Sequence, residues 1–200
     1  MTNTIYKAET SKIFWCMVAQ LIVGLLSGIS TIVAIASTVA SIASEGKVGG
    51  SMALPIIIAL AGIALNIVIL MAYGKLQQDF GANTVDGASF GKLKIAAILA
   101  LVSAAVSIIP VAGSIIAAIC NIVVFILCMM AFSALKKSET FPGKDGASTV
   151  YVSYILALIG AILSIIPVIN IIGAILAIIA LIMLLVGWAK IKNAPLPQEA

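Results

Sequence analysis

The feature that most constrains this 200-residue chain is its division into four long runs that contain no charged residue. These runs cover residues 13–44, 48–74, 95–135 and 146–189. A helix needs about 20 residues to cross a bilayer core of about 30 Å, so each of the first two runs predicts one membrane-spanning helix. The last two runs are about twice as long as one crossing requires, and each predicts a pair of helices.

Proline and glycine mark a turn inside each of the two longest runs. The turns are Pro110-Val111-Ala112-Gly113 and Pro167-Val168-Ile169-Asn170, since proline and glycine interrupt helices. We therefore predict an all-α, integral membrane six-helix bundle built from three consecutive helical hairpins. Its spans are expected at 13–43, 53–74, 92–109, 112–135, 149–166 and 169–190. The first span is longer than one crossing and is expected to tilt or to project beyond the bilayer.

The chain also contains an internal repeat, in which Asp86-Gly87-Ala88-Ser89 recurs as Asp145-Gly146-Ala147-Ser148. Within the spans that follow, Ser107-Ile108-Ile109-Pro110-Val111 recurs as Ser164-Ile165-Ile166-Pro167-Val168. We expect one transmembrane domain over 1–200, with hairpins at 13–75, 92–136 and 149–192 and tails at 1–12 and 193–200. Hairpins two and three are then close repeats that insert the same way up. The Asp or Ser of each repeated segment is expected to cap the helix that it begins.

Lysine positions predict the orientation. Six spans put both termini and the loops near 75–91 and 136–148 on one side, which then carries ten of the eleven lysines; the other side carries Lys47 alone. Cytoplasmic loops are enriched in lysine, so both termini are expected in the cytoplasm, with the inner (plasma) membrane as the default location. Aromatic residues near the same span ends are expected to form an interfacial belt: Phe14, Trp15, Tyr73, Phe90, Phe132, Tyr151, Tyr154 and Trp188.

Composition excludes the chemistry that depends on histidine or arginine. The chain is 63% hydrophobic and 9% charged, whereas soluble domains average about 25% charged residues, and it contains neither His nor Arg. Histidine-based proton transfer, histidine metal sites and bidentate arginine contacts are thereby excluded. The predicted spans hold no ionisable residue away from their ends. We expect no catalytic residue, no metal ligand, no cofactor and no nucleic-acid partner, and we expect the three cysteines to be buried apolar residues.

Uncharged polar side chains are the remaining candidates for a site. On the first helix, small and polar residues that end at the charged Glu45 follow one face at steps of three and four residues: Gln20, Gly24, Ser27, Thr31, Ala34, Thr38, Ser41 and Glu45. Such a stripe is typical of a close helix–helix seam, and the alternative is the wall of a hydrated path. Asn66 and Asn121 are the amides deepest in the spans. Gln20, Thr31, Asn66 and Asn121 are therefore the candidate intramembrane polar contacts.

The hairpin pattern over residues 92–192 consists of an apolar helix, an Ile-Pro-Val turn, a Gly/Ala/Ile-rich helix, and then an aromatic residue and lysine. It resembles small uncharacterised prokaryotic multi-pass membrane protein families, a resemblance that implies no activity. The sequence favours a non-enzymatic structural or accessory subunit that contacts the lipid bilayer and packs with itself or with a membrane-protein partner. The alternative is a passive channel or facilitator for a small polar solute or ion.

Overall fold

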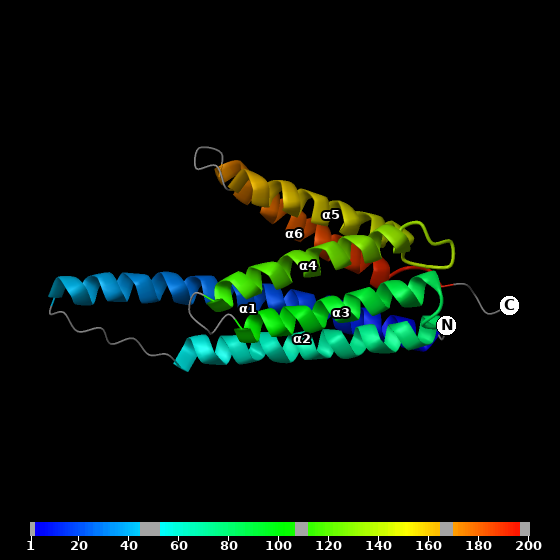
Figure 1. The fold of residues 1–200 in the computed structure, drawn as a ribbon, viewed down its shortest axis with the longest axis horizontal. Coiled ribbons are helices and arrows are strands. Elements are labelled where there is room, and N and C mark those ends of the chain that lie inside the picture. Colours follow the sequence, from blue (N-terminus) through cyan, green and yellow to red (C-terminus); the bar gives the residue numbers. More distant parts are fainter. Residues whose placement is uncertain (1–2, 45–52, 107–111, 165–169, 197–200) are drawn as a thin grey trace.

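The structure is a computed structural model that describes residues 3–44, 53–106, 112–164 and 170–196. Its side chains are described for residues 4–27, 57–106, 116–117, 119–163 and 171–196. The described chain is all-helical, as predicted, with six helices (Figure 1). They are α1 (Asn3–Ser44), α2 (Ala53–Phe80), α3 (Val85–Val106), α4 (Ala112–Leu135), α5 (Lys144–Ser164) and α6 (Asn170–Lys192).

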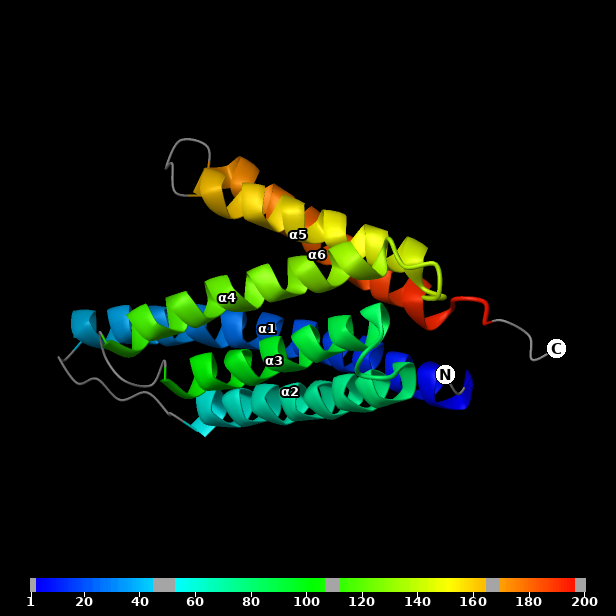
Figure 2. The same cartoon turned by 45° about the vertical axis from the view of Figure 1, so that its right-hand side comes forward.

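The helices form a closed ring in chain order. Each helix packs against the next one in the sequence, and α6 packs against α1. The start of α1, the end of α6 and the α2–α3 and α4–α5 connections lie at the same end of the bundle (Figure 1). We call this the lysine-rich end, because the segments that meet there carry Lys7, Lys12, Lys75, Lys92, Lys94, Lys136, Lys137, Lys144, Lys190 and Lys192. Away from it, α5 and α6 diverge together from the other helices (Figure 2).

Five helices are long and apolar enough to cross a membrane, namely α1, α2, α3, α5 and α6. Helix α4 has 24 residues, and its apolar described stretch, Ile119–Leu135, is shorter than the other five. Helix α1 is far longer than a crossing requires: its 42 residues correspond to about 63 Å at 1.5 Å per residue. Its second half extends past the ends of the neighbouring helices (Figure 1). Residues 3–12, expected as a tail, form the first turns of this helix.

Local sequence explains where α2 ends and α3 begins. Gly81 follows the last residue of α2 with a φ of 86°, a left-handed conformation that glycine adopts without steric cost. Thr84 then caps α3, because its Oγ1 accepts a hydrogen bond of 3.0 Å from the Gly87 amide. The cap is therefore Thr84 and not the predicted Asp86 or Ser89. The Ser89 hydroxyl instead donates to the Val85 carbonyl of its own helix, at 2.8 Å.

Glycines bring α5 and α6 into backbone contact. A Cβ added at Gly146 would lie 2.5 Å from the Gly187 carbonyl oxygen, and one added at Gly160 would lie 2.9 Å from the Gly173 carbonyl oxygen. Small residues permit this close approach of apolar helices. Gly146 and Gly160 therefore lie in a close seam between these two helices. On α3, Ala96, Ala97 and Ser103 are buried, whereas Ala104 is exposed.

Among the described side chains, the large buried ones lie at the lysine-rich end. The largest fully buried side chains include Trp188, Tyr6, Phe90, Phe132 and Phe141. Elsewhere large aliphatic side chains are exposed on every described helix, among them Leu25, Ile57, Ile98, Ile122, Ile162 and Ile171. An apolar surface of this extent marks contact with a membrane or with another protein.

Candidate functional site

Three aromatic side chains from alternate helices meet inside the ring. Tyr73 of α2, Phe132 of α4 and Trp188 of α6 are all buried, and we call them the central aromatic cluster. The Trp188 ring centroid lies 6.1 Å from that of Tyr73 and 5.8 Å from that of Phe132, which is the usual range for aromatic pairs. These rings fill the interior of the helix ring at the lysine-rich end.

Each of these aromatics is followed three residues later by an aliphatic side chain with no exposed surface. These side chains are Leu76, Leu135 and Ile191. Residues three apart lie on the same face of a helix, so α2, α4 and α6 present matching inward faces at this end. Within the described part of the chain, the indole Nε1 of Trp188 is buried and has no hydrogen-bond partner.

A second group of rings, which we call the four-ring cluster, joins the start of α1 to the two connections. It consists of Tyr6, Phe80, Phe90 and Phe141, with ring centroids between 5.4 and 6.2 Å apart in the contacting pairs. The Tyr6 hydroxyl donates a hydrogen bond of 2.8 Å to the Ile191 carbonyl. This bond fixes the first helix to the last and so helps to close the ring.

The prediction of a lipid-facing aromatic belt is wrong for half of its members. Phe90, Phe132 and Trp188 are at most 1% exposed and Tyr73 is 6% exposed, so these rings belong to the core. Trp15, in contrast, is 59% exposed, as a belt residue would be. Proximity to lysine located the correct end of the helices, but it could not show whether a ring faces the lipid or the centre of the bundle.

The predicted polar residues occupy separate places. Gln20 on α1 is half-buried. The Asn66 side-chain amide donates to the Gly62 carbonyl of its own helix at 2.9 Å. Asn121, exposed on α4, accepts a hydrogen bond of 3.1 Å from the hydroxyl of Ser103 on α3. The described hydrogen bonds of the two asparagines thus go to different helices and do not unite them in one site.

The first-helix stripe can be followed only in part. Thr31 lies within α1, but its side chain is outside the described residues, as are those of Ala34, Thr38 and Ser41. At Gly24 an added Cβ would meet no atom within 4 Å. At Gly24, therefore, no described part of the chain packs into the predicted seam. On the opposite face Leu25 is 62% exposed, as expected for a residue that contacts lipid.

Two buried carboxylates at the lysine-rich end were not predicted. Glu9 on α1 is 5% exposed, and its Oε1 lies 2.8 Å from the Lys12 ammonium and 3.3 Å from that of Lys75 on α2. The Glu9–Lys12 spacing is a sequence signal for such a pair, since residues three apart are neighbours on a helix. No sequence signal indicated the contact to α2.

The second carboxylate is Asp86, near the start of α3. Its Oδ2 accepts a hydrogen bond of 2.6 Å from the hydroxyl of Thr140 in the α4–α5 connection. Its Oδ1 is buried and has no hydrogen-bond partner among the described residues. This contact joins the two connections that lie at the lysine-rich end.

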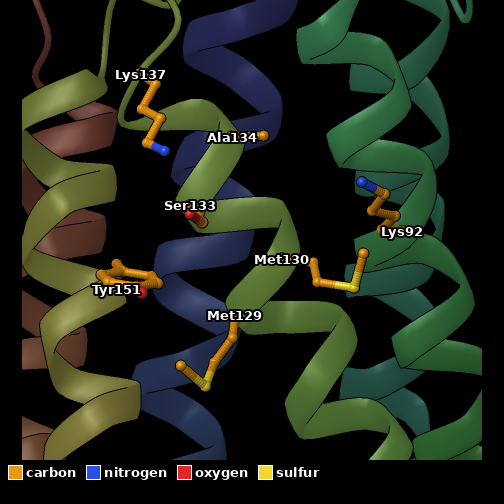
Figure 3. Close-up of a pocket in the computed structure, with 7 residues that line it drawn as sticks. All are labelled: Lys92, Met129, Met130, Ser133, Ala134, Lys137 and Tyr151. Carbon is orange, nitrogen blue, oxygen red and sulfur yellow. The ribbon is translucent and has the colours of Figure 1, made fainter.

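An open pocket of about 470 Å³ lies on the outside of the bundle at the same end. Its lining comes from α3, α4 and α5 and from Lys137, which lies just after the end of α4. The lining residues are Lys92, Met129, Met130, Ser133, Ala134, Lys137 and Tyr151 (Figure 3). The neighbouring Lys136 ammonium lies 3.5 Å from the centroid of the Tyr151 ring, a cation–π contact that holds this ring beside a positive charge.

The chemistry available in the described helices is packing and hydrogen bonding. Cys16, Cys120 and Cys128 are free thiols, of which Cys128 is buried. In the part of the chain that the structure describes, no three His, Cys, Asp or Glu residues come together as metal ligands would. No protein-family model, curated protein or solved structure matches the chain.

Proposed function

We propose that the protein is a multi-pass membrane protein whose six helices all cross the bilayer. The observation that carries the proposal is the contrast between a charged, well-packed end and long helices whose large aliphatic side chains are exposed. Exposure of this kind is stable when hydrocarbon replaces water around the helices. Helix α4, with its 24 residues, is long enough to cross with the others.

We propose further that the protein lies in the inner (plasma) membrane of the cell, with its lysine-rich end in the cytoplasm. Ten lysines belong to the segments at this end, and the lysine bias of short loops sets the orientation of membrane proteins. Reporter fusions made after Lys137 and after Ala200 should both give cytoplasmic signals. A periplasmic signal at either position would contradict the six-span topology.

The three hairpins are proposed to be structural repeats arranged about an axis along the membrane normal. Support comes from the second helix of each hairpin, which contributes one ring to the central aromatic cluster and one fully buried aliphatic residue three positions later. The repeat also predicts that Ser107 and Ser164 occupy equivalent positions, but Ser107 lies outside the described residues, whereas Ser164 is the last residue of α5. Superposition of 92–135 on 149–190 in an experimental structure would test the repeat.

The role that we propose is that of a non-enzymatic structural or accessory subunit, which acts by packing with itself or with a membrane-protein partner. Two features support this role. The central aromatic cluster fills the interior of the ring at one end, which disfavours a continuous path through it. Helix α1 also runs on past its neighbours (Figure 1), and its last 17 residues, 28–44, contain no charge. A helical segment that carries no charge over this length is suited to apolar surroundings such as a bilayer or a partner protein.

A passive channel or facilitator is the second candidate, and the divergence of α5 and α6 from the other helices favours it (Figure 2). In this case the hydroxyl stripe of α1 would face water. A single cysteine introduced by Thr31→Cys, after replacement of the three native cysteines, distinguishes the two roles. A subunit seam predicts slow reaction with a charged thiol reagent, and rapid reaction would favour the channel.

The subunit role also predicts which substitutions disturb assembly. Thr31→Trp should change the mass of the gently extracted complex, because a bulky ring overpacks a close seam. The matched variant Ile32→Trp, on the neighbouring face of the same turn, should leave that mass unchanged. Equal effects of the two variants would refute a seam along this stripe.

A further inference from the structure

We propose that the open pocket between α3, α4 and α5 binds the phosphate head group of an anionic phospholipid. This inference rests on the proposed membrane location of the protein. It concerns a site on the outer surface of the bundle, separate from the central aromatic cluster and from the first-helix stripe. The occupant comes from the leaflet that contacts the lysine-rich end.

The charges of the pocket are all of one sign. Among the described residues that line it, Lys92 and Lys137 are the charged ones, and the Lys136 ammonium lies over the ring of the lining residue Tyr151. In Figure 3 the Lys137 side chain folds back along α4 toward Ser133, and Lys92 reaches toward α4 from α3. The two ammonium groups lie on either side of α4 (Figure 3). Both belong to the lining of one pocket, so its positive charge complements the negative charge of a phosphodiester.

The apolar part of the pocket suits the rest of a lipid. Met129 and Met130 also line the pocket, and the Met130 side chain ends beside Lys92 (Figure 3). Methionine adapts to irregular apolar ligands. Beyond them along α4, Ile126 is 50% exposed and Ile122 is 61% exposed. A head group at the lysines would therefore have its acyl chains against a continuous aliphatic surface.

The position of the pocket along the helices fits the same occupant. Lysine and tyrosine at the end of a membrane span lie at head-group depth, and basic pockets between helices on the cytoplasmic side are suited to anionic head groups. A free phosphate would gain nothing from the methionines and the aliphatic surface below them. This difference separates a lipid from a soluble anion.

The test is native mass spectrometry of the full-length protein after incubation with phosphatidylglycerol and phosphatidylcholine that carry identical acyl chains. We expect the protein to retain phosphatidylglycerol preferentially. Each lysine near an anionic lipid contributes about fivefold in affinity, so the double variant Lys92→Gln/Lys137→Gln should lose about 25-fold in phosphatidylglycerol affinity. Its retention of phosphatidylcholine should not change.

A matched control removes the same charge from the same end. Lys7 and Lys144 are exposed, so Lys7→Gln/Lys144→Gln should keep its preference for phosphatidylglycerol. An equal loss in both double variants would overturn the site, since general surface charge would then explain the binding. The double arginine variant, Lys92→Arg/Lys137→Arg, should retain the lipid, and its failure to do so would also overturn the proposal.

Two further outcomes separate this inference from the proposed function. If inorganic phosphate at millimolar concentration displaces the lipid as effectively as phosphatidylglycerol does, the pocket binds a free anion and the lipid proposal is wrong. If the protein resists alkaline carbonate extraction but shows no lipid preference, only the lipid site fails. Release of the protein by carbonate would instead refute the membrane location itself.

Discussion

Substitution of Gly146 by alanine should destabilise the α5–α6 hairpin, although alanine is the better helix former. Gly146 lies in the first turn of α5, and an added Cβ would stand 2.5 Å from the Gly187 carbonyl oxygen and 2.7 Å from the Ile191 amide nitrogen. Both atoms belong to the backbone of α6, so no side-chain rotation relieves the overlap. The helices must separate, which for overpacked cores costs about 1–3 kcal/mol.

Helix propensity offsets part of this cost, because alanine in a helix interior gains about 0.5–1 kcal/mol over glycine. With backbone atoms on both sides of the overlap we expect a net loss of about 2 kcal/mol from the free energy of unfolding. For a chain of this size each kcal/mol shifts the melting temperature by about 2–4 °C. The variant should therefore melt about 4–8 °C below the wild type.

The matched control is Gly62→Ala in the middle of α2. An added Cβ there meets no atom within 4 Å, so this variant should melt at or slightly above the wild-type temperature. Reaction of the buried Cys128 thiol with a fluorogenic reagent during heating would report unfolding, after Cys16 and Cys120 are replaced by alanine. A Gly146→Ala protein that melts at or above the wild type would refute the backbone contact.

Three further perturbations remove hydrogen bonds between different elements of the bundle, each tested by the same melting measurement. Tyr6→Phe should cost about 1 kcal/mol, because it removes the hydroxyl that fixes α1 to a carbonyl of α6; an unchanged melting temperature would contradict that bond. Thr140→Val should cost about 1–3 kcal/mol, since it leaves the buried Asp86 carboxylate without its hydroxyl donor, and Thr140→Ser should restore most of the loss. Ser103→Ala should cost only about 0.6 kcal/mol, the average for hydrogen bonds between membrane helices, and a loss as large as that of Thr140→Val would show that Asn121 matters more than this.

The helices were predictable because charge and proline act locally. Each predicted span overlaps one observed helix, and Pro110 and Pro167 precede α4 and α6 as the hairpin prediction requires. Helix ends were less accurate on the side of the lysines. Helix α3 begins seven residues before Lys92, its predicted start, because a helix can continue with charged residues after it leaves the hydrocarbon.

The inward-facing residues could not be predicted, for a physical reason. In a water-soluble protein the buried face of a helix is apolar and the opposite face is polar, so the sequence pattern shows which face is buried. Helices such as α2 and α6 are apolar on all sides, so periodicity cannot tell a side chain that contacts lipid from one in the core. Tyr73 and Trp188 were therefore assigned to the wrong environment. The carboxylate of Glu9 was missed for the opposite reason, because a charge before the first span gave no indication of burial.

The bundle is held together by two different kinds of packing, and they act at different places. Within the last hairpin, glycines allow α5 and α6 to touch through their backbones as far along as Gly160 and Gly173. Between this hairpin and its neighbours, the described ring contacts are made by Phe125 and Phe132 of α4 with Tyr154 of α5, and by Trp188 with Tyr73 and Phe132. Aromatic side chains join this hairpin to the other helices, whereas backbone contact holds α5 to α6. The hairpin can therefore diverge from α1 and α4 without separation of its own two helices, which is the arrangement seen in Figure 2.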